Sequence, residues 1–232
     1  MMAWDSRIAE GMRRQSRLRQ ERLQAGAKVV GWKVGFGAPA AMQKLRIAAP
    51  LVGFILDRGM LAPGAAVSLA GWQKPVAEPE IAVRIGRDVP PDADDATARA
   101  AIAALGPAIE VADADGPMDD VEAVLACDIF QRHVIIGPAD PSRAGARLDG
   151  LRGHVNRSGQ RTDAPTDLEA NTGALVSIVR HVAATTAHFA DGLRAGHFII
   201  AGSVVPPLFV APGESLSFEL APVGAVSVEF TA

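Results

Sequence analysis

Cysteine is nearly absent from this sequence of 232 residues, which contains only Cys127. A single thiol cannot form an intramolecular disulfide, and the sequence has no CxxC motif and no Cys/His spacing typical of a zinc site. These absences indicate a reducing, cytoplasmic compartment. Cys127 is expected to be a small, buried, apolar side chain.

The sequence also lacks a strong excess of charge of one sign and lacks a long apolar run. Its 23 Lys and Arg residues nearly balance 26 Asp and Glu residues, for a formal net charge of -3. Neither a nucleic acid nor an anionic membrane is therefore expected as the main partner. No apolar stretch approaches the roughly 18 residues of a membrane span, and the Arg-rich N-terminus has no apolar core of a secretion signal. Small molecules or other proteins are the expected partners.

Length and composition indicate one globular domain with an N-terminal appendage. With 49% hydrophobic and 21% charged residues, the chain can bury a sizeable core. Residues 1–27 are predicted to form an N-terminal helical segment, in which residues 4–24 are amphipathic and Gly26 ends the helix. Residues 28–232 are predicted to form the main domain.

Changes in the hydrophobic period divide the main domain into strands and helices. Residues 28–36, KVVGWKVGF, alternate with a period of two, which predicts a strand. Helices are predicted at residues 92–105, where Gly106 ends the helix, at residues 117–128, and at residues 171–196, which is expected to be the longest. Short β-branched strands follow. Because strands and helices do not alternate regularly, the pattern predicts an α+β fold with a mostly antiparallel or mixed sheet.

Two carboxylates, Glu78 and Glu80, begin an apolar run that otherwise indicates a buried strand. Residues two apart on a strand share a face, so these side chains would project side by side, roughly 7 Å apart along the backbone. Pro79 between them cannot donate to a sheet ladder, which predicts a sheet edge, a strand start or a bulge. A solvated strand face is the alternative interpretation of this pair.

A third carboxylate favours a metal site. Glu110 lies in the apolar stretch LGPAIEVADA, where an unpaired buried charge is costly unless a cation or hydrogen bonds satisfy it. Three carboxylates from two strands could hold Mg²⁺ or Mn²⁺ and leave positions on the ion for water or substrate.

Two further positions could contact a ligand. Lys33 lies in the first strand between Gly31 and Gly35, which share its face and would leave space over its ammonium group. Partial desolvation would lower the pKa of this lysine, although an extended lysine at a sheet edge is the alternative. Gly202 and Ser203 end an apolar strand, where they could hold a carboxylate or simply form a turn.

Four blocks occur in a fixed order: GWKVGFG, EPEIAVRIGRDV, GPAIEVAD and LRAGHFIIAGSVVPPLFVAPGESLSFELAPVGAVSVEF. Together they resemble the fumarylacetoacetate hydrolase superfamily, from about residue 28 to the C-terminus. Within it, the sequence looks most like the 2-oxopent-4-enoate hydratases and 4-oxalocrotonate decarboxylases of aromatic catabolism.

This resemblance implies a mixed β-roll flanked by helices, a homo-oligomer, and a catalytic domain at residues 28–232. It also implies that Glu78, Glu80 and Glu110 bind Mg²⁺ or Mn²⁺ and that Lys33 transfers a proton. The substrate-binding residues expected on the same basis are Lys74, Gly202, Ser203 and Leu51.

One block departs from the hydratases. The hydratases tend to have an acidic residue at the position of Leu51 in APLVGF, whereas the decarboxylases usually have an apolar residue there. The apolar Leu51 therefore favours decarboxylation. The resulting hypothesis is a metal-dependent lyase that acts on a small 2-oxo or 2-hydroxydienoic acid through a metal-stabilised enolate. The alternatives are an acylpyruvate-type C–C hydrolase, whose usual His-Glu pair is not evident near the N-terminus, and a catalytically silent partner of a related pathway enzyme.

Overall fold

Two β-sheets organise residues 4–232, the part of the chain that the computed structural model describes; residues 1–3 of the predicted N-terminal segment lie outside it. The larger sheet contains, in spatial order, β2 (Leu51–Leu56), β1 (Val29–Gly35), β10 (Phe198–Ser203), β5 (Pro75–Ile85), β6 (Ile102–Asp113), β7 (Gln131–Ile136) and β3 (Met60–Leu61), with β11 (Leu208–Phe209) also paired to β5. The smaller sheet contains β4 (Ala65–Ser68), β13 (Gly224–Thr231), β12 (Ser215–Ala221), β8 (Arg152–Arg157) and β9 (Gln160–Asp163).

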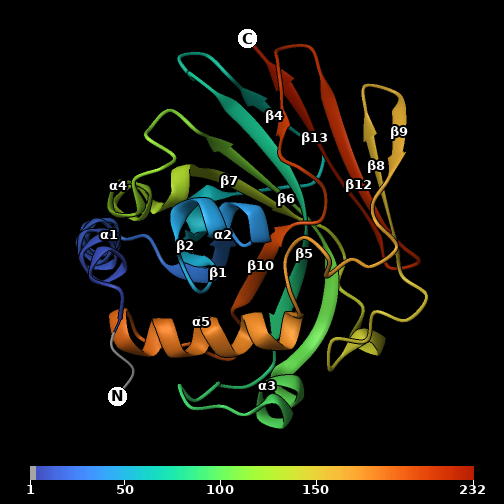
Figure 1. Ribbon diagram of the computed structural model, residues 1–232. Helices are drawn as coiled ribbons and strands as arrows, with labels where there is room; N and C mark the ends of the chain where they lie inside the picture. The colour runs from blue at the N-terminus through green and yellow to red at the C-terminus, as the bar shows by residue number, and fades with distance from the viewer. Residues whose placement is uncertain (1–3) are drawn as a thin grey trace.

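Both sheets are mixed. The pairs β1–β10, β3–β7 and β4–β13 are parallel, and the other pairs are antiparallel. The predicted α+β class with a mixed sheet is therefore confirmed. Figure 1 shows the smaller sheet on the side of the molecule opposite to α1 and α4.

Five α-helices surround the larger sheet. They are α1 (Ser6–Gln24), α2 (Pro39–Leu45), α3 (Asp95–Ala101), α4 (Val121–Ala126) and α5 (Leu175–Phe189), and the short 3-10 turns are η1 (Asp57–Gly59), η2 (Asp128–Phe130) and η3 (Pro141–Arg143). Helix α5 lies beneath β1 and β10 (Figure 1), and its buried residues include Leu175, Val179 and Val182. No helix within residues 4–232 combines the length and the apolarity that a membrane crossing requires.

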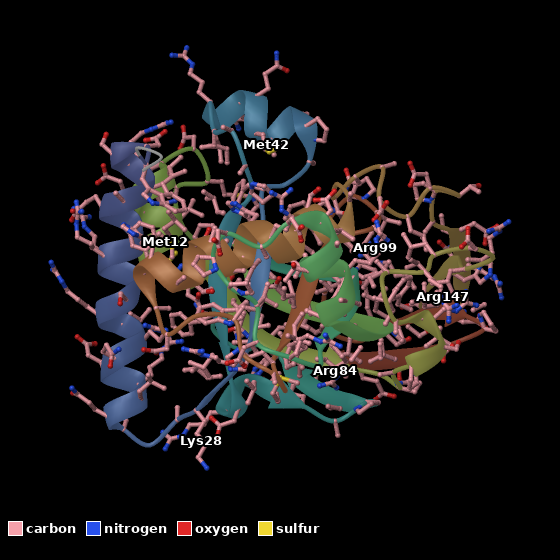
Figure 2. The ribbon with its side chains drawn as sticks, turned by 90° about the horizontal axis from the view of Figure 1, so that it is seen from below. Met12, Lys28, Met42, Arg84, Arg99 and Arg147 are labelled. Carbon is pink, nitrogen blue, oxygen red and sulfur yellow. The ribbon has the colours of Figure 1, made fainter. Side chains whose placement is uncertain are left out.

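The N-terminal helix is docked onto the rest of the molecule. In the view from below, α1 runs along one edge with Met12, which is buried, on its inner side (Figure 2). Gly11 lets α1 approach α4 closely, since an added Cβ would lie 2.7 Å from the Cβ of Leu125. The buried amide of Gln15 donates to the carbonyls of Val52 and Leu125, at 3.1 Å each.

The long antiparallel pair β5–β6 forms the centre of the larger sheet. Its register runs from Pro75 opposite Asp113 to Ile85 opposite Ile102, and nearly every residue of β6 is buried. Strands buried on both faces are apolar without alternation, which explains their near-continuous runs of Ala, Ile and Val.

Three local predictions were wrong. Helix α3 ends at Ala101, and Gly106 lies inside β6, where an added Cβ would meet the carbonyl oxygen of Pro138 at 2.3 Å. The longest helix is α1, with 19 residues against 15 in α5. Cys127 is exposed, because α4 ends immediately before it and turns its side chain out of the core.

Pro79 is not at a sheet edge or a strand start, since β5 lies between β10 and β6. The third predicted alternative, an irregular pairing, is present: the β10–β5 register shifts between Ile200 and Ser203. The carbonyl of Pro79 accepts a hydrogen bond from the backbone N–H of Val204, at 2.9 Å. The missing N–H of the proline thus faces a gap in the ladder, where no donor is needed.

Candidate metal centre and active site

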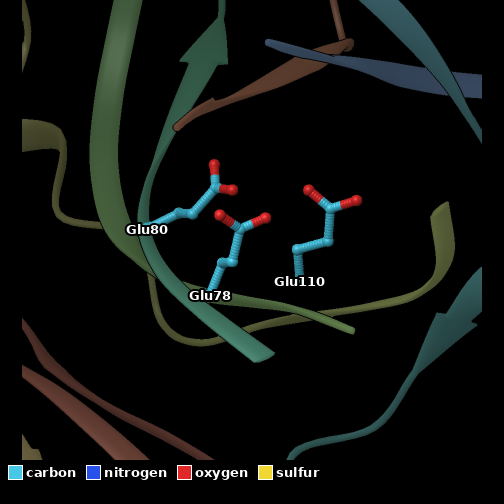
Figure 3. A group of neighbouring side chains, drawn as sticks. All are labelled: Glu78, Glu80 and Glu110. Atoms are coloured by element: carbon cyan, nitrogen blue, oxygen red, sulfur yellow. The ribbon is translucent and has the colours of Figure 1, made fainter. Parts of the chain in front are cut away.

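Three glutamates converge at the middle of the larger sheet (Figure 3). Glu78 on β5 lies directly opposite Glu110 on β6, and Glu80 follows two residues later on the same face of β5. One carboxylate oxygen from each lies within 4.8 Å of the other two. The structure therefore brings together the three carboxylates that the sequence predicted as a group.

Burial makes this cluster electrostatically unfavourable without a cation. Glu80 and Glu110 are each 1% exposed, and Glu78 is half-buried. Burial and the charge of Glu110 raise the pKa of Glu78 to about 7, and the same causes raise the pKa of Glu80 well above its usual range. One buried oxygen of Glu110, Oε2, has no hydrogen-bond partner among residues 4–232. Such a set of hard oxygen donors with excess negative charge fits a divalent cation.

Lys33 is the ammonium group in contact with the cluster. It lies on β1, is 1% exposed, and its Nζ donates to Glu110 Oε1 and, at 3.2 Å, to the carbonyl of Ile129. Burial opposes its charge, but the charges of Glu110 and Glu78 outweigh this effect and raise the pKa of Lys33. The predicted lowering was therefore wrong for the metal-free protein, because the sequence did not reveal how closely the carboxylates surround this lysine.

The sequence suggested that the two glycines beside Lys33 leave space for a ligand; the space beside Gly31 is filled, whereas Gly35 lines the cavity described below. An added Cβ on Gly31 would lie 3.0 Å from the Phe198 ring, and one on Gly35 would lie 2.8 Å from Ile129 Cγ2. Phe198 fills the space beside Gly31, and Gly35 forms part of the cavity wall next to Ile129. The role of the two glycines in the structure is to permit close packing around β1.

Gly202 and Ser203 are the last two residues of strand β10, not a turn, and they touch the cluster directly. The backbone N–H of Gly202 donates to Glu80 Oε2 at 2.7 Å, and the hydroxyl of Ser203 donates to the carbonyl of Pro79 at 3.4 Å. Gly202 has a φ of 88°, a backbone conformation that favours glycine. This end of β10 thus holds one carboxylate of the cluster in place.

A cavity of 310 Å³ opens beside the carboxylates. Its polar lining side chains are those of Lys33, Glu78, Asn171, Thr172 and Ser203, and Gly202 contributes backbone. The rest of the lining is apolar and includes Phe36, Val76, Met118, Phe130 and Phe209. The volume and the few polar groups suit a small organic acid.

Two predicted substrate-binding residues, Leu51 and Lys74, do not line the cavity. Leu51 is 1% exposed, packs in the core on β2 and is not among the residues that line the cavity. Lys74 is exposed just before β5, with its Nζ 5.3 Å from the ring centroid of Phe209 and 3.9 Å from the sulfur of Met118. Because both of these neighbours line the cavity, Lys74 lies at its rim.

Asp128 is a buried carboxyl that the sequence analysis missed. It is 1% exposed, and its Oδ1 accepts from the backbone N–H of Phe54 at 2.9 Å; its Oδ2 has no hydrogen-bond partner within the described part of the chain. Burial raises the pKa of Asp128 to about 8. The available signal was a carboxylate inside the apolar stretch around CDIF, the same kind of signal that identified Glu110.

The fold and the site define an enzyme of the α+β class with a buried carboxylate cluster, a neighbouring lysine and a small cavity. The chain belongs to the fumarylacetoacetate (FAA) hydrolase C-terminal family, whose model matches residues 28–231. The family resemblance predicted from the four sequence blocks is thereby confirmed.

Relatives within this family include hydratases and decarboxylases. The chain is 28% identical over 216 residues to the 2-hydroxyhexa-2,4-dienoate hydratase of Comamonas testosteroni, covering 89% of this chain and 80% of that protein. It is 25% identical over 228 residues to a 4-oxalocrotonate decarboxylase of Pseudomonas sp, covering 97% and 87%. These relatives identify the chain as similar to lyases of small unsaturated acids.

Solved structures agree with this placement. The 4-oxalocrotonate decarboxylase from Pseudomonas putida G7, complexed with magnesium and adipate, matches with a TM-score of 0.87 and 25% identity, covering 96% of this chain and 86% of that one. The fumarylpyruvate hydrolase from Pseudomonas aeruginosa, in complex with Mn²⁺ and pyruvate, matches with a TM-score of 0.67 over 86% of this chain and 88% of that one. At 16% identity, the second likeness establishes the fold alone.

Proposed function

We propose that the protein is a divalent-metal-dependent lyase that acts on a small 2-oxo acid or on the corresponding 2-hydroxydienoic acid. The observation that carries this proposal is the convergence of three carboxylates and one buried lysine beside a cavity of 310 Å³. Relatives named as hydratases and decarboxylases support the same class. Hydration of a conjugated dienoate and decarboxylation of a 2-oxo diacid are the two candidate reactions.

Glu78, Glu80 and Glu110 would hold Mg²⁺ or Mn²⁺ in this proposal. Their oxygen donors, their mutual repulsion and the unpartnered oxygen of Glu110 support it, as do the magnesium and calcium complexes of the related decarboxylase. Bound there, the ion would supply Lewis-acid chemistry by polarising the carboxylate and 2-oxo oxygens of the substrate.

The chain's own residues would then handle protons and orientation. Lys33 Nζ holds a proton at the cavity wall, and we assign to it the transfer that interconverts the enol and keto forms of the substrate. Ser203 at the cavity wall is assigned to the substrate carboxylate, and the Gly202 N–H fixes the Glu80 ligand. The apolar part of the lining excludes bulk water, which strengthens these interactions.

The family resemblance and the relatives also suggest a biological setting. In this proposal residues 28–232 form the catalytic domain and residues 1–27 an N-terminal helical segment docked against it. The enzyme works as a homo-oligomer in the cytoplasm, in the breakdown of aromatic compounds, alone or in a complex with a related pathway enzyme. Size-exclusion chromatography with light scattering tests the oligomer directly.

Two other functions remain as alternatives to the lyase. Acylpyruvate-type hydrolysis has the fold of a hydrolase neighbour in its favour. A catalytically silent partner subunit would explain the apolar residue at Leu51, but it would leave the buried Lys33 and three glutamates without a use, and buried charges are costly to keep.

Product analysis by NMR tests the proposed function. The purified protein is incubated with Mg²⁺ and either 2-hydroxypenta-2,4-dienoate or 4-oxalocrotonate, and a matched sample contains EDTA. Metal-dependent formation of a 4-hydroxy-2-oxo acid from the dienoate identifies a hydratase, and loss of CO₂ from oxalocrotonate identifies a decarboxylase. If neither compound changes, the lyase assignment is wrong.

A further inference from the structure

Three consecutive residues after α4 have left-handed backbone conformations. Asp128 has a φ of 58°, Ile129 of 52° and Phe130 of 63°, and none of them is glycine. Asp tolerates this region better than most residues, but it is strongly disfavoured for a β-branched residue such as Ile129. Strained backbone of this kind persists only where its surroundings hold it, and it gathers at functional sites.

Asp128 anchors this turn to the larger sheet. Its buried Oδ1 accepts the backbone N–H of Phe54 on β2, at 2.9 Å. The adjacent Gly53 makes room for the anchor, since an added Cβ there would lie 2.8 Å from Asp128 Oδ1 and 2.9 Å from Lys33 Cγ. Asp128 and Lys33 therefore pack together over the one residue of β2 that has no side chain.

The turn presents its next carbonyl to Lys33. Ile129 O accepts from Lys33 Nζ at 3.2 Å, and the Ile129 and Phe130 side chains line the cavity. The other side-chain or carbonyl acceptor of this ammonium is Glu110, which the proposed function assigns to a cation. Of the two acceptors that Lys33 Nζ has among residues 4–232, Glu110 is a candidate metal ligand and the carbonyl of Ile129 is not.

We propose that the left-handed turn Asp128–Phe130 fixes the Lys33 ammonium group at the cavity wall and that Asp128 is a positioning residue for the reaction. The proposal rests on the proposed function, because it concerns the proton that Lys33 transfers. The anchor hydrogen bond sets the turn, the turn sets the Ile129 carbonyl, and the carbonyl sets Lys33 Nζ. A long, flexible lysine side chain is thereby held in one orientation.

Two substitutions separate the anchor from the backbone conformation. Asp128→Asn keeps an oxygen acceptor for the Phe54 N–H and tolerates the left-handed region. Asp128→Gly keeps the conformational freedom and removes the anchor. The matched control is Asp120→Ala, because Asp120 also accepts backbone N–H groups, from Glu122 and Ala123, but caps α4 away from Lys33.

Kinetics provide the first measurement, with Mn²⁺ affinity and melting temperature measured in parallel. Asp128→Gly should lose kcat on the order of 100-fold, as expected for a displaced catalytic group, while KM and Mn²⁺ affinity change by less than about 3-fold. Asp128→Asn should keep most of the wild-type kcat, and Asp120→Ala should lower only the melting temperature. A kcat for Asp128→Asn as low as that of Asp128→Gly, or an unchanged kcat in Asp128→Gly, would overturn the proposal.

A second measurement does not depend on turnover. In protein labelled at lysine nitrogen, the ammonium signal of Lys33 is identified by its loss in Lys33→Met. Slow proton exchange of this signal in the wild type and in Asp128→Asn, with faster exchange in Asp128→Gly, supports the positioning role. Equal exchange in all three contradicts it. If exchange responds as expected but no substrate turns over, the proposed function fails while the positioning contact stands.

Discussion

Two kinds of neighbour act on the Glu80 carboxylate. The other two glutamates repel its negative charge, and the Gly202 N–H stabilises it by a hydrogen bond. Glu80→Gln removes the charge and keeps the shape. We expect the Mn²⁺ affinity to fall by more than about 100-fold, because even outer-shell partners of a metal site are worth about 10- to 100-fold. Isothermal titration calorimetry measures this loss.

Lys33→Ala is the control for that experiment. It should leave Mn²⁺ affinity within about 3-fold of the wild type and lower kcat by about 100- to 10,000-fold, the usual contribution of a positioned acid or base. An active Glu80→Gln protein with normal metal affinity would contradict the proposed metal centre.

The pKa of Glu78, raised to about 7, makes metal binding depend on pH. In the metal-free protein this carboxyl holds a proton below pH 7, and a metal ligand must release it. We expect Mn²⁺ affinity to rise as the pH increases from 5 to 8, with proton uptake by the buffer during titration. Calorimetry in buffers of different ionisation enthalpy counts the protons; no proton release at pH 6 would be inconsistent with this assignment.

The carboxyl of Asp128 makes stability depend on pH in the opposite sense from a salt-bridged aspartate. Its pKa is raised from 3.8 to about 8 in the folded protein, so between these values the folded state binds one proton more than the unfolded state. The free energy of unfolding should therefore fall as the pH rises from 4 to 8. Asp128→Asn should flatten this slope by more than about 1 kcal/mol over the window, as measured by urea unfolding of the metal-free proteins.

At the scale of elements, the spacing along β5 relates Lys74 to the metal centre. Residues 74, 76, 78 and 80 have the same parity, and Val76 and Glu78 both line the cavity while Lys74 lies at its rim. Lys74 would thus face the far end of a substrate whose first carboxylate is beside Ser203, as in the proposed function. Lys74→Met should raise KM for the diacid 4-oxalocrotonate about 2- to 5-fold, because an exposed ion pair contributes only a small binding free energy.

The monoacid 2-hydroxypenta-2,4-dienoate is the matched comparison for Lys74→Met, and its KM should not change. Equal effects on both substrates would show that Lys74 does not distinguish their far ends. Initial-rate kinetics with the two substrates, at fixed Mg²⁺, give the comparison.

Elements whose period is local were predictable from the sequence. The strand at residues 28–36 and the helix at residues 4–24 were found because alternation and an amphipathic stripe need no knowledge of partners. The strand around Glu110 was expected, but the start of β6 was assigned to the helix at residues 92–105, because an Ala- and Ile-rich run fits a helix or a buried strand equally well. The pairing with β5 determines that this run is a strand, and that pairing joins residues distant in sequence.

The candidate site divides in the same way. Glu78, Glu80 and Glu110 were predictable because their spacing and apolar surroundings are visible in the sequence. The location of Leu51 in the core, the filling of the space beside Gly31 and the left-handed turn at Asp128 were not visible, since each depends on which strand or side chain packs against it.

At the scale of the whole molecule, the site is assembled from segments that are distant in sequence. Strand β1 supplies Lys33, β5 and β6 supply the glutamates, and β10 supplies the Gly202 N–H that holds Glu80. Every one of these strands is interior to the larger sheet. The carboxylate cluster therefore depends on the sheet as a whole.

The parallel pairing of β1 with β10 has a consequence for synthesis on the ribosome. Gly31 and Phe198 are partners although about 170 residues separate them, and translation at about 5–20 residues per second takes roughly ten to thirty seconds to cover that interval. Throughout this time the nascent hairpin of β1 and β2 exposes an unpaired edge. Strand β10 thus closes the larger sheet and joins Gly202 to Glu80, so the carboxylate cluster cannot be complete before β10 has emerged.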